Sequence, residues 1–277
     1  MTVIPKYLKT YFKSLEEEHG IFLEPGQKLW YAMKYKELGD DIKREYPSTP
    51  EESFMGSNEG FWYAKEMNVA QEDGRITQVP FQKNMQVYTA WDIGFGDPTA
   101  IWFFQLVPTG SINIIDYYEN QGEGLIHYIT YLQKIKYSNN YAKHFFPHDA
   151  AAHDKGSGLS LEKQAKDLGM KVQVLDRYNT RKSSFVIEVQ RCRNMISQCY
   201  FDEEKCAAGI NSLRAYKKRW NEKMAFYTDE PVHDQHSHAA DAFRYMAQAI
   251  YLEINKSSQS ALEKERQKIA RARMGFV

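Results

Sequence analysis

Three β-rich runs that follow one another closely limit most strongly how this chain can fold. They span Met85–Trp91, Thr99–Val107 and Ser111–Glu119, and short breakers that contain Gly and Pro separate them. Closely spaced strands joined by such turns pair side by side as an antiparallel meander. The sequence therefore predicts three neighbouring antiparallel strands in the middle of the chain.

Helical and β-rich stretches alternate after these three strands. The expected elements, in chain order, are a helix over 123–138, a strand over Lys143–Pro147, a helix over 160–168, a strand over Lys171–Leu175 and helices over 183–198, 203–218 and 235–254. Antiparallel strands followed by alternating helices and strands form a mixed sheet with helices packed against it. The predicted fold class is therefore α/β, with a mixed sheet flanked by helices.

The first 80 residues carry a different pattern. Helices are expected over 7–18 and 27–38, aromatic residues are frequent, and no catalytic motif is recognisable. The last residues are predominantly basic. We therefore divide the chain into a helical N-terminal extension (1–80), a mixed-sheet domain (81–252) and a basic C-terminal tail (253–277).

Composition excludes several classes of protein. Hydrophobic residues make up 43% and aromatic residues 14% of the chain, which excludes a disordered protein. No apolar run approaches the roughly 20 residues of a membrane-spanning helix, and the N-terminus lacks the apolar core of a signal peptide. The three cysteines are too few for a disulfide framework, and they indicate a reducing cytoplasm.

The charge is balanced overall but unevenly distributed. The chain carries 36 basic and 36 acidic side chains, whereas residues 160–225 hold 14 basic and 8 acidic ones. Such a stretch fits either a solvated helix surface or the binding of an anionic partner. The best candidates for contacts to DNA phosphates are Arg177, Arg181, Lys182, Lys217, Lys218 and Arg219, which cluster near expected loops.

Three aspartates lie where active sites are commonly found. Asp92 ends the first expected strand before a glycine-rich turn, Asp149 follows the fourth strand, and Asp241 lies on the last helix. Loops at strand ends are the usual ligand sites of open α/β sheets. If the first and fourth strands are neighbours, Asp92 and Asp149 lie close together. Asp92 and Asp149 could also simply form turns.

The last expected helix carries polar side chains at helical spacing. Asp234, His238, Asp241 and Tyr245 are separated by four, three and four residues, so they share one face if the helix extends back to 234. The opposite face is apolar, so we expect this helix to pack on the sheet. His238 could ligate a metal ion, transfer a proton or only cap the site.

The three aspartates suggest a metal site. Carboxylates that converge without a basic partner need a proton or a divalent cation between them. Oxygen ligands favour Mg²⁺ or Mn²⁺, and two such ions about 4 Å apart promote phosphoryl displacement. Asp97, five residues after Asp92, could reach the same ions. Histidines also allow a zinc site, but no HExxH or paired CxxC motif is present, and no GxxxxGKS/T phosphate-binding loop occurs.

Four segments together resemble the large terminase subunit of tailed bacteriophages. Residues 90–100 (AWDIGFGDPTA) are similar to its first acidic motif, Pro147–Asp149 to its second and His238–Tyr245 to its third. Residues 44–54 (REYPSTPEESF) resemble the segment that joins the packaging ATPase of the family to its nuclease. The resemblance covers residues 45–252 in the order that the family has.

This resemblance implies an RNase H-like endonuclease that cuts concatemeric double-stranded viral DNA during genome packaging. Asp92, Asp149 and Asp241 would be its catalytic, metal-binding triad, with Asp97 and His238 as further metal-site residues. The implied cofactors are two Mg²⁺ or Mn²⁺ ions. The implied partners are double-stranded DNA, the portal protein and the small terminase subunit, in the cytoplasm of the bacterial host.

The resemblance does not include one domain of the family's proteins. The ATPase motor with its phosphate-binding loop is missing, and residues 1–44 would correspond to the last portion of that motor. We therefore expect a truncated chain or a gene fragment that cleaves DNA without translocating it.

Two other functions stay open. A resolvase or transposase uses the same kind of metal triad, although junction resolution has no use for the segment at 44–54. A non-catalytic module that binds DNA or the portal would need no metal ions. Dependence of cleavage on a divalent cation separates the enzymes from the binding module.

Overall fold

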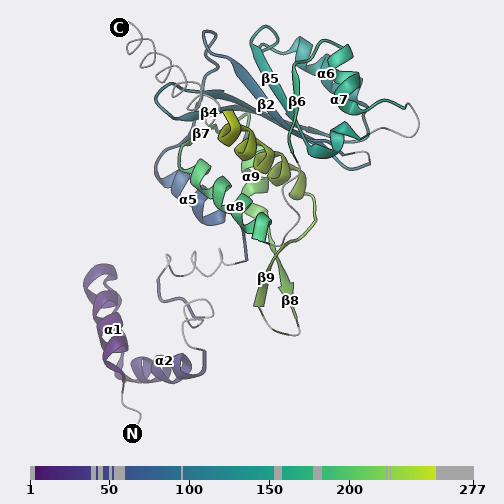
Figure 1. Ribbon diagram of the computed structural model, residues 1–277. Helices are drawn as coiled ribbons and strands as arrows, with labels where there is room; N and C mark the ends of the chain where they lie inside the picture. Colours follow the sequence, from purple (N-terminus) through teal and green to yellow (C-terminus); the bar gives the residue numbers. More distant parts are fainter. Residues whose placement is uncertain are drawn as a thin grey trace, which may run out of the picture.

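A seven-stranded sheet forms the centre of the structure (Figure 1), a computed structural model that describes residues 4–38, 42, 46–49, 52, 60–94, 96–152, 158–176, 183–222, 224 and 226–253. Across the sheet the strands lie in the order β1 (Ile76–Thr77), β7 (Cys199–Asp202), β4 (Ile112–Asn120), β3 (Thr99–Leu106), β2 (Val87–Asp92), β5 (Tyr141–Phe146) and β6 (Val172–Val174). A separate pair, β8 (Lys218–Asn221) and β9 (Phe226–Pro231), forms an antiparallel hairpin.

The three strands predicted as a meander form the middle of this sheet. β2 pairs with β3 and β3 pairs with β4, in both cases antiparallel. The remaining pairs in the sheet, β1–β7, β4–β7, β2–β5 and β5–β6, are parallel. The predicted α/β fold, in which three antiparallel strands precede alternating helices and strands, is therefore confirmed.

Both faces of the sheet are covered, as the burial of β3 shows. Seven of its eight residues are buried. Alternate side chains of a strand point to opposite faces, so Trp102 and Phe104 enter one hydrophobic cluster whereas Ile101 and Phe103 enter another. A strand that is buried on both faces has a continuous apolar sequence, and β3 has such a sequence from Ala100 to Phe104.

Two groups of helices cover the two faces. α6 (Leu125–Lys134) and α7 (Leu161–Asp167) contribute to the cluster that contains Ile101. The cluster that contains Trp102 is covered by α5 (Ala64–Glu72), α8 (Ser183–Ile196), α9 (Ala207–Ala215) and a C-terminal helix over 237–253. Figure 1 shows this yellow-green helix beside α8 and α9. None of the helices in the described ranges has the length and apolar character that crossing a bilayer requires.

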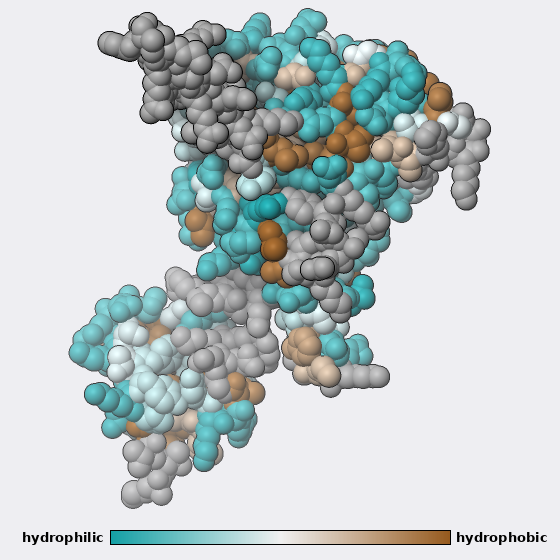
Figure 2. Space-filling view, viewed as in Figure 1, coloured by the Kyte–Doolittle hydropathy of each residue, from teal (hydrophilic) through white to brown (hydrophobic). Residues whose placement is uncertain are grey.

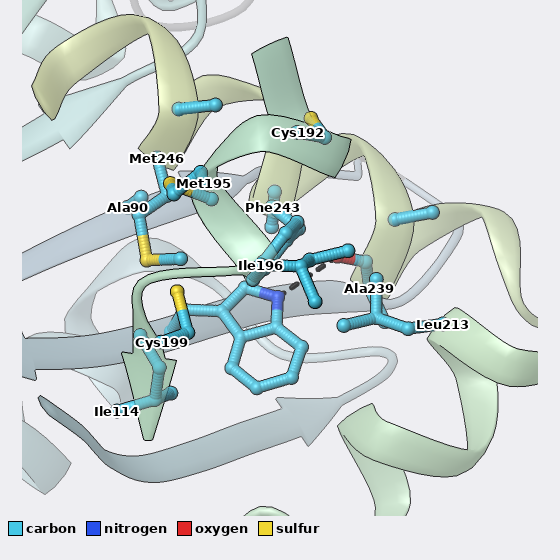
Figure 3. Packing of buried hydrophobic residues seen from close by; sticks show 14 of the residues in the cluster. Ala90, Ile114, Cys192, Met195, Ile196, Cys199, Leu213, Ala239, Phe243 and Met246 are labelled. Carbon is cyan, nitrogen blue, oxygen red and sulfur yellow. Dashed lines mark hydrogen bonds between the residues drawn. The ribbon is translucent and has the colours of Figure 1, made fainter. Parts of the chain in front are cut away.

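Trp102 fixes the C-terminal helix on the sheet. Its side chain is fully buried, and its Nε1 donates a hydrogen bond of 2.8 Å to the Ala239 carbonyl (dashed line in Figure 3). The same ring lies against Gly209 of α9, where an added Cβ would lie 2.3 Å from a ring carbon. Because only glycine leaves room for the ring, α9 can approach the sheet closely at this point.

Two strands of the sheet, β1 and β7, and the hairpin were not predicted from the sequence. β1 comprises only two residues. Helices were expected over 183–198 and 203–218 with nothing between them, whereas β7 lies there and pairs with β4 on one side and β1 on the other. β7 is only four residues long, so its alternation is too short to recognise. The second helix ends earlier than predicted, and the hairpin strand β8 begins at Lys218.

The N-terminal helices form a hydrophobic cluster of their own. α1 (Lys6–His19) and α2 (Pro25–Leu38) match the two predicted helices, although α2 begins at Pro25, where proline is favoured because its fixed φ suits the first turn. The buried side chains of the cluster are Leu8, Phe12, Leu15, Tyr31, Ala32 and Ile42. No residue of this cluster belongs to the clusters of the sheet, whose described members begin with Trp62.

His144 of β5 gives the fold a testable pH dependence. The side chain is buried, its Nδ1 lies 2.7 Å from Thr89 Oγ1, and burial lowers its pKa from 6.5 to about 4. The unfolded chain therefore binds the proton more readily, so the stability that neutral His144 provides is complete above pH 6.5 and is lost as the pH falls towards 4. We expect a loss of about 3 kcal/mol over this range.

Urea unfolding of wild type and His144→Gln between about pH 4 and pH 7 measures this contribution. The wild type is expected to lose stability more steeply than the variant as the pH falls. Parallel pH profiles would show that His144 does not contribute.

Candidate active site

Asp92 is the last residue of β2 and points to the face of the sheet that the C-terminal helix covers. It lies opposite Ala100 of β3, and Ala100 belongs to the cluster of Trp102. Directly paired residues of neighbouring strands point to the same face. The Asp92 side chain is 20% exposed, so a ligand can reach it from solvent.

Asp149 lies at the same end of the sheet as Asp92. It belongs to a single 3₁₀ turn, η2 (His148–Ala151), which comes directly after β5 and Pro147. β2 and β5 are parallel neighbours, so their carboxyl ends meet at one edge of the sheet, and the condition under which the sequence places Asp92 near Asp149 is met. Asp149 is exposed at this edge.

The C-terminal helix brings His238 into contact with Asp92. The helix begins at residue 237, so His238, Asp241 and Tyr245 lie on it at helical spacing, whereas Asp234 lies before its first turn. His238 Nδ1 lies 3.1 Å from Asp92 Oδ2. Residues 146 positions apart in the sequence thus form one hydrogen-bonded pair.

The charges around this pair influence one another. Burial raises the pKa of Asp92, and the negative charge of Asp241 raises it further. The hydrogen bond to His238 lowers it, but burial has the larger effect. The same hydrogen bond raises the pKa of His238. Burial, followed by the charges of Asp92, Asp241 and Asp149, raises the pKa of Tyr245. All three carboxylates therefore lie within electrostatic range of Tyr245.

Asp241 has a basic partner that the sequence analysis did not single out. Arg244 lies one turn later and donates to Asp241 Oδ1 from Nη2 at 2.8 Å. Arg244 Nη1 also pairs with Glu188 of α8. The spacing of Asp241 and Arg244 is a recognisable signal for a helical ion pair. Glu188 lies 56 residues before Arg244, and no sequence pattern connects the two.

Glu119 is a further carboxylate on the face of Asp92, and no motif contains it. Glu119 lies opposite Ala100 across β3 and β4, so Asp92, Ala100 and Glu119 form one row across three strands. The Tyr117 hydroxyl donates a hydrogen bond to Glu119. The predicted meander could have indicated the position of Glu119, because it places the end of the third strand near the end of the first.

Asp97 lies on the exposed turn that follows Asp92. A Cβ added at Gly94 would lie 2.5 Å from the Asp97 carbonyl oxygen, so this turn requires glycine. After the larger effect of Asp92, the negative charge of Asp97 also raises the pKa of His238. The structure therefore places Asp97 within electrostatic range of the site but on its outer rim.

The donors at this site suit a hard divalent cation, although they are engaged in ion pairs. Carboxylate oxygens are the ligands that Mg²⁺ and Mn²⁺ prefer. Among the described residues, no group of three His, Cys, Asp or Glu side chains is arranged to hold an ion. Instead Asp92 pairs with His238 and Asp241 pairs with Arg244. Binding of a cation therefore requires these carboxylates to rearrange.

The six basic residues predicted to contact DNA fall into two groups. Three of them, Arg177, Arg181 and Lys182, lie outside the described residues. The others lie at the start of the hairpin, and each contacts another side chain: Lys217 pairs with Asp234, Lys218 lies over the Trp62 ring and Arg219 pairs with Glu230. Exposed ion pairs of this kind are weak and can exchange for another anion.

Solved structures that resemble this chain include phage large terminases and large terminase nuclease domains. The large terminase of a thermophilic bacteriophage matches with a TM-score of 0.53 and 16% identity, over 88% of this chain and 60% of that protein. The P22 large terminase nuclease domain matches with a TM-score of 0.47 and 17% identity, over 64% of this chain and 89% of that domain. The large terminase nuclease of thermophilic phage G20c with bound magnesium gives 0.45 and 11%, over 68% and 97%. No protein-family model and no curated protein matches the chain.

The fold resembles that of a phage large terminase. The resemblance that the motifs predicted is therefore confirmed at the level of structure, at low sequence identity. The chain spans about 60% of the length of the full large terminase that it matches. Asp92, Asp149 and Asp241 keep their predicted roles as hypotheses, because similarity of fold does not assign them.

Proposed function

We propose that this chain is a metal-dependent endonuclease that cleaves double-stranded viral DNA during genome packaging. One observation carries the proposal: at one edge of a sheet whose fold resembles that of a phage large terminase, Asp92 pairs with His238, and Asp241 lies near enough for its charge to raise the pKa of Asp92. Paired acids at a strand end and on a facing helix suit hydrolysis of a phosphodiester, because metal ions bound there would contact the phosphate.

In this proposal Asp92, Asp149 and Asp241 hold Mg²⁺ or Mn²⁺. The bound ions would lower the pKa of a water molecule and neutralise negative charge that develops on the phosphate. His238 orients the Asp92 carboxylate through its Nδ1. Asp97 and Glu119 add negative charge around His238, which strengthens the attraction of the site for a cation.

The packaging context is part of the same proposal. DNA would be bound through its phosphates, the portal protein and the small terminase subunit would be partners, and the chain would act in the cytoplasm of a bacterial host. The sequence predicts that residues 1–80 correspond to the end of an ATPase domain and 81–252 to the nuclease. The separate cluster of α1 and α2 supports two units, but α5 and β1 belong with the sheet, so the proposed boundary lies between Ile42 and Trp62 and not at residue 80.

A non-catalytic module that binds DNA or the portal is the second candidate. One observation favours it: Arg244 neutralises Asp241, and the described residues contain no ready-made group of three metal ligands. Such a module would bind DNA equally well with and without divalent cations.

Plasmid cleavage followed by gel electrophoresis distinguishes the two functions. Wild-type protein is expected to nick and linearise supercoiled plasmid with Mn²⁺ or Mg²⁺ and to be inactive in EDTA. Asp241→Ala is expected to abolish cleavage and retain DNA binding, because it removes a proposed metal ligand. Folded wild-type protein that binds DNA but cleaves with neither ion would instead support the binding module.

A further inference from the structure

Asp241 is held through only one of its two carboxylate oxygens. Arg244 donates to Oδ1 from Nη2 at 2.8 Å and from Nε at 3.3 Å, and the Tyr216 hydroxyl donates to the same oxygen at 3.4 Å. Within the described ranges no hydrogen bond reaches Oδ2 of Asp241. The Asp241 side chain is 25% exposed, so its second oxygen is available to a ligand.

Arg244 is itself fixed by contacts to α8. Its Nη1 pairs with Glu188, and its guanidinium carbon lies 5.0 Å from the centre of the Phe185 ring. The side chains of Arg244 and Glu188 are only 19% and 11% exposed. A planar guanidinium can bind two carboxylates and stack on a ring at the same time, which a lysine ammonium cannot do. Asp241 is thus connected to α8 through a rigid partner.

We propose that Arg244 and Glu188 position Asp241 for metal binding. Arg244 holds Oδ1, Glu188 holds Arg244, and Oδ2 is left to the metal ion. The inference rests on the proposed nuclease function and makes Arg244 a positioning residue that does not contact the ion. Outer partners of this kind orient metal ligands, and loss of one commonly lowers metal affinity about 10- to 100-fold.

The other possible role of Arg244 is charge balance, and it predicts an effect of opposite sign. A positive charge beside the carboxylates repels a cation, so its removal strengthens the attraction of the site for Mn²⁺. If Arg244 only balances charge, its loss leaves Mn²⁺ binding unchanged or tighter. If Arg244 positions Asp241, its loss makes Mn²⁺ binding weaker despite the more negative site.

Calorimetric titration of the full chain with Mn²⁺ measures whether Mn²⁺ affinity falls or rises, and it does not depend on cleavage. The main variant is the double substitution Arg244→Gln with Glu188→Gln, which leaves no unpaired carboxylate at the site of Glu188. It is expected to bind Mn²⁺ about 10- to 100-fold more weakly than wild type. Arg244→Lys keeps the charge and loses the planar fork, so its affinity is expected to fall between the two.

Arg191→Gln is the control for loss of an arginine that lies between α8 and the C-terminal helix. Arg191 also connects α8 to the C-terminal helix, because its guanidinium carbon lies 4.6 Å from the centre of the Tyr251 ring. This variant is expected to bind Mn²⁺ about as tightly as wild type. Circular dichroism verifies that each variant is folded, and Arg244→Lys decides the outcome if the double variant is not.

The possible results distinguish failure of the proposed metal site from failure of the positioning role. Wild-type protein that does not bind Mn²⁺, or binds it as tightly after Asp241→Asn, would overturn the proposed metal site. Binding that depends on Asp241 but is unchanged or tighter in the double variant, or in Arg244→Lys, would overturn only the positioning role of Arg244 and Glu188.

Discussion

Asp92→Asn is expected to lower the rate of metal-dependent DNA cleavage about 10³-fold. Asp92 ends β2 beside β5, which leads to Asp149, and contacts the helix that carries Asp241, so it would neighbour both of the other proposed ligands. Ions bound at such a site supply several kcal/mol of transition-state stabilisation, and a loss of about 4 kcal/mol corresponds to about 10³ in rate. Initial rates of plasmid nicking at saturating Mn²⁺ measure the effect.

Asp97→Asn is the control for this prediction. Asp97 lies on the exposed turn after Asp92, so the same loss of charge is expected to reduce cleavage much less. Asparagine has nearly the shape of aspartate, and the far-ultraviolet circular dichroism of both variants is expected to match wild type. Full cleavage by Asp92→Asn would show that Asp92 is not a ligand.

Trp102→Ala is expected to lower the free energy of unfolding by about 3–5 kcal/mol, because it leaves a large cavity in the core. The Trp102 side chain is fully buried against Gly209 and Phe243, and its hydrogen bond to the Ala239 carbonyl is lost as well. This is a large part of the roughly 5–15 kcal/mol that stabilises a typical domain. Urea unfolding followed by circular dichroism measures the change.

Trp220→Ala is the matched control, because Trp220 is 41% exposed on the β8–β9 hairpin. Figure 2 shows apolar side chains at the end of this hairpin that no described element covers. Trp220→Ala is expected to change the free energy of unfolding far less than Trp102→Ala. A small effect of Trp102→Ala would mean that the C-terminal helix docks without the tryptophan.

The middle of the sheet was predictable because its signals are local. The runs that became β2, β3 and β4 are apolar and separated by Gly and Pro, and neighbouring strands joined by short turns have few alternatives. β7 was not predictable, because four residues between two helices carry too little periodicity. Its position between β1 and β4 depends on contacts far along the chain.

The local features of the candidate site were also predictable. The sequence predicted that His238 and Asp241 share one face of a helix packed on the sheet and that Asp92 ends a strand. The contact of His238 with Asp92 comes from the structure. The pairing of Arg244 with Glu188 was not predictable, since it depends on how α8 packs beside the C-terminal helix. Partners within one helix can be recognised from sequence, whereas partners on separate elements require the tertiary structure.

The order of the elements along the chain also determines when the site can form during synthesis. Asp92 and Asp149 leave the ribosome well before the helix over 237–253, which brings His238 and Asp241 with it. Trp102 and Gly209, which receive this helix, are by then already synthesised. A nascent chain therefore has most of its sheet before it has a complete acidic cluster. Under the proposed function, DNA cleavage is thus confined to chains whose translation has passed residue 241.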